Sequence, residues 1–525
     1  MCRLFAITIS ILSLAICHAA PGNDRPKLVV GIVVDQLQTD YLDYLRPMMS
    51  KGGFNRLLGN GLYITDLDFG VPHTDAASAT AQLYTGSWPA NTGVAAATVF
   101  DRNTRRMIPV LLDGKSYSPQ RLSLSTVTDE LVIDGQRFGK VYSLAIDPQT
   151  AVLMGGHSPT STAWIDPATG QWATSSYYNT MLPAPLAKRN VRKPLRSRLD
   201  TMRWEPLLNV KDYPGLPPQK KYQPFSHRLH SSSRDAYSLF GATPPGNREV
   251  TDVAIEYLNE LKPGHGNGTI DMLNLGYSLA PFTATRDGDY RIELLDSYLR
   301  LDLDLERLLN ALDKSVGLDN TLIFLVSTGH FDNDAQPSSV YRIPGGEVST
   351  KRAEALLNSY LSAKYGHADY IDGIAGTHVY FNPNALEAAM RRIAPGGETP
   401  LQAARDFLTR MDGISSAATV SDILGGTTES LEEAKRAIDA QNAGELIMEI
   451  QPGWVLVDDN ATPVVRRVIR RSAVATPAII LSPSLAPGKI SEPVSALRIA
   501  PTLSRLLHLP SPNGALGRSL PVNTR

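Results

Sequence analysis

The chain has 525 residues and a formal net charge of −1, with 42% hydrophobic and 20% charged residues. This charge argues against a nucleic-acid-binding protein, which usually carries a basic excess. The composition is that of a globular protein long enough to bury a large core.

Residues 1–19 have the pattern of a secretory signal peptide. Arg3 supplies a positive charge, residues 4–17 carry none, and Ala19 is a small residue before the expected cleavage point. Cleavage after Ala20 is an alternative. The segment is too short for a good membrane-spanning helix, and no later stretch is long and apolar enough for one. The sequence therefore predicts export.

Both cysteines of the chain, Cys2 and Cys17, lie in this segment. The mature chain then has no thiol and forms no disulfide, which fits the periplasm or outer surface of a bacterium. A lipid anchor at Cys17 is not expected, because Ile16 stands where a lipoprotein signal has a small residue.

Residues 27–35, Lys-Leu-Val-Val-Gly-Ile-Val-Val-Asp, predict a strand buried on both faces, as in the centre of a parallel sheet. Ligands bind at the carboxyl ends of such strands. Asp35 is therefore a candidate site residue, the alternative being a cap for the next helix.

Helical and strand patterns alternate along the rest of the chain, which predicts an α/β fold with a doubly wound, mostly parallel sheet and helices on both faces. Helices are expected at 122–131, 250–261, 293–312 and 499–507, and strands at 140–146, 270–275, 321–326 and 478–481.

Two regions interrupt the alternation within a single domain at 20–525. A loop-rich cap is expected at about 155–245. An inserted α+β subdomain is expected at about 340–455. Its predicted elements are helices at 351–365, 399–411 and 431–441 and a strand at 377–381.

Ten short segments, in order along nearly the whole mature chain, carry a resemblance to a known family. They are residues 27–36, 52–58, 83–89, 128–131, 156–157, 164–166, 169–172, 296–302, 452–454 and 499–503. In these segments the sequence resembles the secreted, threonine-nucleophile alkaline phosphatases. That branch belongs to the superfamily that includes nucleotide pyrophosphatases and phosphodiesterases.

The resemblance implies two zinc ions that activate an alcohol nucleophile and hold the phosphoryl group, with six Asp and His ligands. Carried over by position, the nucleophile falls on Ala76, which cannot attack phosphorus. The oxyanion-binding asparagine falls among residues 96–98. The Lys and Arg that clamp phosphate fall on the segment with Asp147 and Gln149.

The ligand positions are similarly depleted. Asp35 and His330 remain, and the resemblance assigns both to the same metal. The other four positions fall on residues without a metal-binding side chain, namely Gly276, Ala280, Gly329 and Ala475. Because two ligands rarely hold zinc tightly, we expect no cofactor.

These losses favour a catalytically inactive relative that acts in binding or scaffolding, with a protein or a small molecule as its unidentified partner. Since Asp75 and Asp147 stand near the former phosphate site, phosphate should bind poorly, and a neutral or cationic ligand is expected instead.

The alternative is a phosphomonoesterase or phosphodiesterase with a rearranged site for one zinc ion. Asp35, Asp75, His330 and Asp332 would hold the metal, with Thr74 or Ser78 as nucleophile. Carboxylates and hydroxyls are also common in loops for turn and capping reasons. Two further histidines, His157 and His378, are interpreted as structural.

Overall fold

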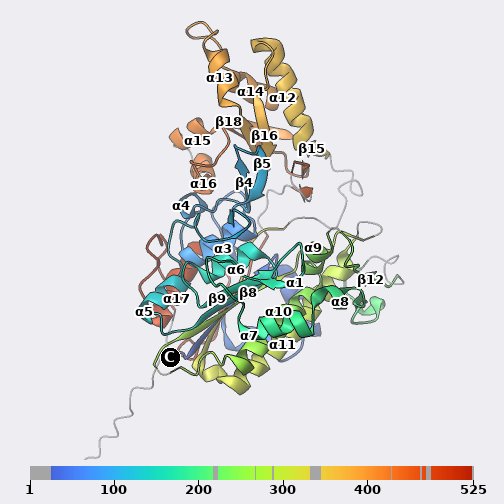
Figure 1. Cartoon of the computed structure of the whole chain (residues 1–525), viewed down its shortest axis with the longest axis vertical. Helices are drawn as coiled ribbons and strands as arrows, with labels where there is room; N and C mark the ends of the chain where they lie inside the picture. Colours follow the sequence, from blue (N-terminus) through green and yellow to red (C-terminus); the bar gives the residue numbers. More distant parts are fainter. Residues whose placement is uncertain are drawn as a thin grey trace, which may run out of the picture.

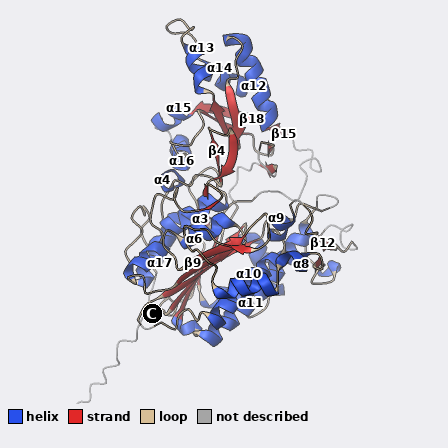
Figure 2. Ribbon diagram, viewed as in Figure 1, coloured by secondary structure: helices blue, strands red, loops and turns tan. Residues whose placement is uncertain are grey.

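The computed structural model describes residues 25–216, 223–233, 235–266, 268–285, 289–331, 345–426, 429–460, 464–468 and 474–522. A nine-stranded sheet lies at the centre of the main domain (Figure 2). Its strand order is β10-β9-β8-β13-β1-β14-β22-β2-β23. Strands β9, β8, β13, β1 and β14 run parallel, whereas β10 and β22 are antiparallel to their neighbours. The sheet strands are β1 (Leu28–Asp35), β2 (Leu62–Ile64), β8 (Val141–Ala145), β9 (Ser161–Ile165), β10 (Trp172–Ala173), β13 (Asp271–Ser278), β14 (Thr321–Ser327), β22 (Ala478–Leu481) and β23 (Gly488–Ile490).

Strand β1 shows why the sheet needs helices on both faces. Alternate side chains of a strand point to opposite faces. Leu28, Val30 and Ile32 belong to one hydrophobic core, and Val29 and Val33 belong to the other. The continuous apolar run therefore supplies both cores at once.

Two groups of helices cover the sheet, one on each face (Figure 1). One face carries α1 (Thr39–Leu45), α2 (Phe54–Asn60), α7 (Ala184–Arg192), α8 (Leu195–Leu199), α9 (Ala236–Gly241), α10 (Pro244–Glu260) and α11 (Arg291–Ser315). The other carries α3 (Ala76–Thr85), α5 (Val127–Asp134), α6 (Pro148–Gly155) and α17 (Ile499–Leu507).

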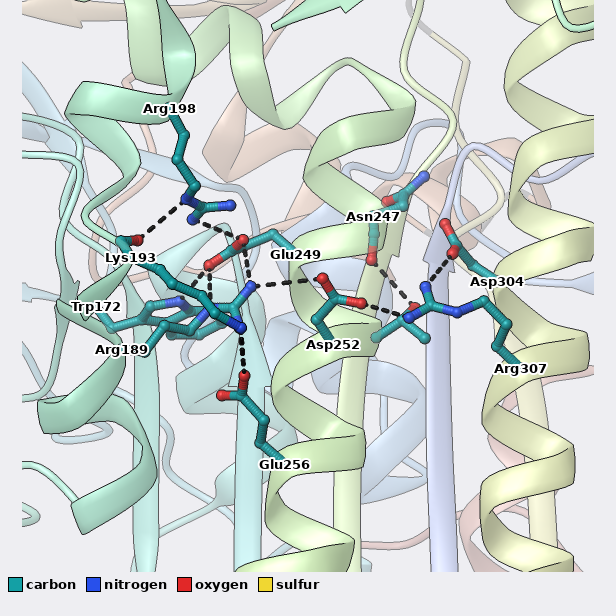
Figure 3. Close-up of polar contacts among 11 residues, drawn as sticks. Trp172, Arg189, Lys193, Arg198, Asn247, Glu249, Asp252, Glu256, Asp304 and Arg307 are labelled. Atoms are coloured by element: carbon teal, nitrogen blue, oxygen red, sulfur yellow. Dashed lines mark hydrogen bonds and ion pairs between the residues drawn. The ribbon is translucent and has the colours of Figure 1, made fainter. Parts of the chain in front are cut away.

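Helices α7 and α10 are joined by a buried ion network that continues to α11 (Figure 3). Glu249 of α10 accepts hydrogen bonds from Arg189 of α7 at 2.6 and 2.7 Å and from Arg198 at 2.9 Å. The side chains of Arg189 and Glu249 are only 3% and 2% exposed. The network continues through Asp252 to Arg307 of α11 at 2.6 Å.

A smaller α+β unit projects from the carboxyl edge of the sheet and has a hydrophobic core of its own (Figure 1). Its strands form sheets in the orders β16-β17-β19-β18 and β15-β20-β21. We call this unit, which includes residues 347–468, the insert. Its elements are β15 (Glu347–Ser349), α12 (Thr350–Tyr365), β16 (Ile371–Ala375), β17 (His378–Phe381), α13 (Pro383–Met390), α14 (Pro400–Leu408), β18 (Ile414–Thr419), α15 (Val420–Gly425), α16 (Glu429–Ala437), β19 (Leu446–Ile450), β20 (Val455–Asp458) and β21 (Val465–Val468).

A hairpin of the main domain supports the insert. The ring of Phe100 in this hairpin stacks on Tyr380 with centroids 4.5 Å apart, and Arg102 bonds Glu445 at 2.6 Å. The hairpin consists of β4 (Thr98–Asp101) and β5 (Arg106–Pro109). The remaining short elements are β3 (Leu67–Asp68), α4 (Pro89–Thr92), β6 (Leu112–Asp113), β7 (Ser116–Tyr117), β11 (Arg203–Trp204), β12 (His227–Arg228) and β24 (Val494–Ser495).

The predicted fold class is confirmed, and the helices and strands that were predicted differ from the observed ones mainly at their ends. Helix α10 begins six residues before the predicted start at 250, with prolines in its first turn, where they are tolerated. Helix α5 begins at Val127 rather than 122, because the Thr126 hydroxyl accepts from the Asp129 amide in a capping box.

The proposed signal peptide, including Cys17, and the candidate ligand Asp332 lie outside the described residues. Within the described ranges, no helix is long and apolar enough to cross a membrane.

Candidate functional site

The carboxyl ends of the parallel strands meet at a large cavity, as expected for an open α/β sheet. Its volume is about 740 Å³, and the insert forms its far wall. The candidate residues that line it are Asp35, Thr74, Asp75, Ala76, Ser78, Asp147, Gly276, Ala280 and His330. The structure thus brings together nine positions that are spread over almost 300 residues of sequence.

Asp35, at the end of β1, lies beside the loop that follows β14. Its Oδ1 accepts a hydrogen bond from the Thr328 hydroxyl at 2.8 Å and lies 3.4 Å from Nδ1 of His330. Asp35 does not cap the next helix, because Gln38 holds that position. The two remaining ligand candidates are therefore adjacent at the base of the cavity.

The amino end of α3 forms a second wall. Asp75 is its N-cap, and its Oδ1 accepts from the Ser78 amide at 2.9 Å, while the Ser78 hydroxyl accepts from the Asp75 amide at 3.0 Å. Oδ2 of Asp75 accepts from the amide of Ala97 at 2.6 Å. Ala76, the first residue of α3, presents only a methyl group to the cavity.

The two hydroxyls considered as alternative nucleophiles already have partners. The Ser78 hydroxyl belongs to the capping box and is almost fully buried. The Thr74 hydroxyl donates to the carbonyl oxygen of Thr328 at 3.4 Å.

Asp147 caps α6 at the third wall. Its Oδ2 accepts from the amide and hydroxyl of Thr150 at 2.7 and 2.8 Å. The side chain is accessible from the cavity but surrounded by protein beyond it. This burial raises the pKa of Asp147, and the charge of Asp75 raises it further. Gln149, by contrast, bonds the backbone of Leu111 and Ala97 and does not line the cavity.

Two of the lost-ligand positions are glycines with no room for a side chain. A Cβ on Gly276 would lie 2.7 Å from the Cβ of Ala145, and a Cβ on Gly329 would lie 2.3 Å from the ring of Phe69. Gly329 also has a φ of 71°, which disfavours other residues. Gly329 and Ala475 are not among the lining residues, whereas Ala280 is.

Sequence reasoning missed most of the wall that the insert supplies. His378, interpreted as structural, begins β17 and lines the cavity, where burial lowers its pKa to about 4. Asp439, Asp458 and Arg467 also line it. Each was separated by more than 100 residues from the Asp35–Asp147 segments, so no local pattern in the sequence indicated the contact.

His157, the other histidine interpreted as structural, lies outside this cavity. Its Nδ1 is 2.9 Å from Asp129 Oδ2, and its Nε2 is 2.9 Å from the carbonyl of Leu122. The hydrogen bond to Asp129 outweighs burial and raises the pKa of His157. With acceptors on both nitrogens, the ring serves to join α5 to the loops around it.

A sequence model of the "Type I phosphodiesterase / nucleotide pyrophosphatase" family matches residues 29–471. The chain belongs to this family.

Comparison with individual proteins supports this family assignment. The chain is 28% identical to the alkaline phosphatase PhoV of Synechococcus elongatus, over 94% of this chain and 92% of that protein. It is 27% identical to the alkaline phosphatase PafA of Elizabethkingia meningoseptica, over 94% of each chain. The crystal structure of wild-type PafA superposes with a TM-score of 0.80 at 25% identity, covering 94% of this chain and 98% of that one.

The resemblance to alkaline phosphatases implies a two-zinc centre, but the described donor atoms do not fit one. Asp35 and His330 form a pair, whereas catalytic zinc sites use three protein ligands. Within the described part of the chain, no group of three or more His, Cys, Asp or Glu side chains is arranged to hold a metal ion.

Proposed function

We propose that this member of the phosphodiesterase family is an exported binding protein that retains the family's cavity without its hydrolytic chemistry. The observation that carries the proposal is Ala76. It lies at the first position of α3, faces the cavity, and occupies the position that the resemblance gives to the nucleophile. An alanine has no atom that can attack phosphorus.

The surroundings of Ala76 support the same proposal. The amide of Ala97 lies in the segment where the resemblance places oxyanion binding, and it donates to the chain's own Asp75. The clamp positions carry the Asp147 carboxylate and the Gln149 amide, and Gln149 is engaged elsewhere. An entering phosphate would meet carboxylates where it needs cations.

Metal content and turnover test the proposal. The full-length chain is expressed in a bacterial host, and the exported protein is purified and assayed with p-nitrophenyl phosphate and bis-p-nitrophenyl phosphate in added zinc. We expect no stoichiometric zinc and no turnover above that of a His330→Ala preparation.

The mass of the intact exported protein tests export. A mass that corresponds to a chain beginning at Ala20 would support export, and protein retained in the cytoplasm with residues 1–19 uncleaved would contradict it.

A second candidate function rests on the adjacency of Asp35 and His330, which lie 3.4 Å apart. With Asp75, which lines the same cavity, and Asp332, they would bind one zinc ion in a phosphoric-ester hydrolase. PhoV and PafA, both named alkaline phosphatases, favour this class by kinship. Stoichiometric zinc together with turnover that disappears in His330→Ala would establish the second function and exclude the first.

A further inference from the structure

The charges that face the cavity are unbalanced. Its lining includes five aspartates, whereas Arg467 is the one arginine among the described lining residues and no lysine occurs there. The aspartates are Asp35, Asp75, Asp147, Asp439 and Asp458. A cavity with this charge repels anions and attracts cations.

Two of these carboxylates lack a cationic partner. Asp75 and Asp147 accept hydrogen bonds from backbone amides and hydroxyls, and no Lys or Arg in the described ranges forms an ion pair with either. The charge of Asp75 also acts on Asp147. A cation that enters between two neighbouring carboxylates relieves the repulsion between their charges.

The walls near Asp147 are apolar. Ile146 and Pro148 flank it in sequence, and the amide of Ile165 bonds the carbonyl of Ile146 at 3.3 Å. All three line the cavity, as do Val110 and Tyr237. A metal ion needs several oxygen ligands, and of these five residues only Tyr237 carries a side-chain oxygen. A ligand with an apolar skeleton and a positive charge would match both the apolar walls and the two carboxylates.

We propose that the cavity binds a small organic cation, an ammonium or amidinium group on an apolar body, with its charge at Asp75 and Asp147. This inference rests on the binding function proposed above and names its ligand class. The amide and hydroxyl hydrogens that fix the two carboxylates hold them in place before the ligand enters, which reduces the entropy lost on binding.

Matched probes test the inference by calorimetry and thermal shift at low ionic strength. The panel pairs arylalkyl amines and benzamidine with alcohols and amides of the same skeleton, and includes phenyl phosphate and Ca²⁺. We expect at least one cation to bind about tenfold or more tighter than its neutral partner, as a charge-assisted hydrogen bond predicts. Phenyl phosphate and Ca²⁺ should not bind measurably.

Asp147→Asn is the decisive variant, because Asn can still cap α6. It should weaken the cation about tenfold or more and leave the neutral partner unchanged. Asp200→Asn is the matched control, since Asp200 accepts from Ser231 and does not line the cavity. If Asp147→Asn does not fold, Ala96→Leu should weaken binding instead, because it adds bulk in the cavity beside Ala97, whose amide donates to Asp75.

The inference is overturned if no cation in the panel binds tighter than its neutral partner, if phenyl phosphate or Ca²⁺ binds tightest, or if Asp147→Asn or Ala96→Leu binds the cation like the wild type. These outcomes are separable from failure of the proposed function. Hydrolysis of phenyl phosphate refutes the proposed function, whereas an inert protein without cation preference refutes only the ligand class.

Discussion

At the scale of single residues, two of the four positions that the resemblance assigns to absent metal ligands, Gly276 and Gly329, have no free space for a side chain. The backbone of β13 at Gly276 packs so closely against β8 and α6 that neighbouring side chains occupy the space a ligand would need. We infer that a metal ligand at Gly276 or Gly329 would fit only if its neighbours moved.

Gly276→Asp should accordingly destabilise the protein without restoring chemistry. The new Cβ would lie 2.7 Å from Ala145 and 3.0 Å from Thr150 Cγ2. Overpacking of this kind costs about 1–3 kcal/mol. Urea denaturation measures the loss in the free energy of unfolding. Ala280→Asp is the control, because Ala280 faces the cavity and is partly exposed. Equal stability of the two variants would show that β13 can yield at Gly276.

At the scale of elements, the sequence predicted what local patterns encode. The sequence predicts β1, β14 and α11 close to their observed bounds. A strand buried on both faces leaves a continuous apolar run, and a helix buried on one stripe leaves a periodic apolar pattern. The supporting hairpin β4–β5 was missed. Its stability depends on contacts such as Phe100 with Tyr380, which are 280 residues apart.

The same distinction holds for the site. Asp35, Ala76 and His330 were located from the strand ends and the resemblance, and the cavity does contain them. The aspartates and histidine that the insert contributes have no local spacing to one another or to Asp35. Only the folded chain places them opposite the sheet.

The network that joins α7, α10 and α11 leads to a prediction about stability and its pH dependence (Figure 3). Burial of Glu249 opposes its charge, but the hydrogen bonds and charge of Arg189 outweigh this and lower the pKa of Glu249. Glu249→Gln would leave Arg189 and Arg198 without their shared buried partner, at a cost of about 3–5 kcal/mol near neutral pH.

Because the folded-state pKa of Glu249 is lowered, its stabilisation is present above the ordinary value of 4.5 and is lost as the pH falls through the folded value. The gap between wild type and Glu249→Gln should therefore narrow in acid, as measured by denaturation over a pH series. Glu256 also bonds Arg189, at 2.6 Å, but its side chain is 28% exposed. Glu256→Gln should therefore cost less than about 1 kcal/mol. A similar loss in both variants would contradict the role assigned to burial.

At the scale of the whole molecule, the main domain and the insert share one cavity. The main domain supplies its floor and the insert its far wall. The contacts between the two units include Phe100 on Tyr380, Arg102 with Glu445, and Arg436 over the ring of Trp88 at 4.8 Å. A ligand that touches both units would add to these contacts.

Phe100→Ala should loosen the insert while leaving the central sheet intact. Truncating a buried phenylalanine costs about 3–5 kcal/mol, and here the lost contact is mainly with Tyr380, Ala375 and Met107. Amide exchange in β17 should become faster by on the order of 100-fold, whereas β1 and β14 should keep their protection.

Phe407→Ala is the matched control, since Phe407 stacks on Tyr360 within the insert at 4.6 Å. It should affect α12 and α14 and spare the hairpin, because its ring packs in the insert's own core. Uniform acceleration through both units in Phe100→Ala would mean that the insert and the sheet unfold as one cooperative body, and the cavity would then open only by global unfolding.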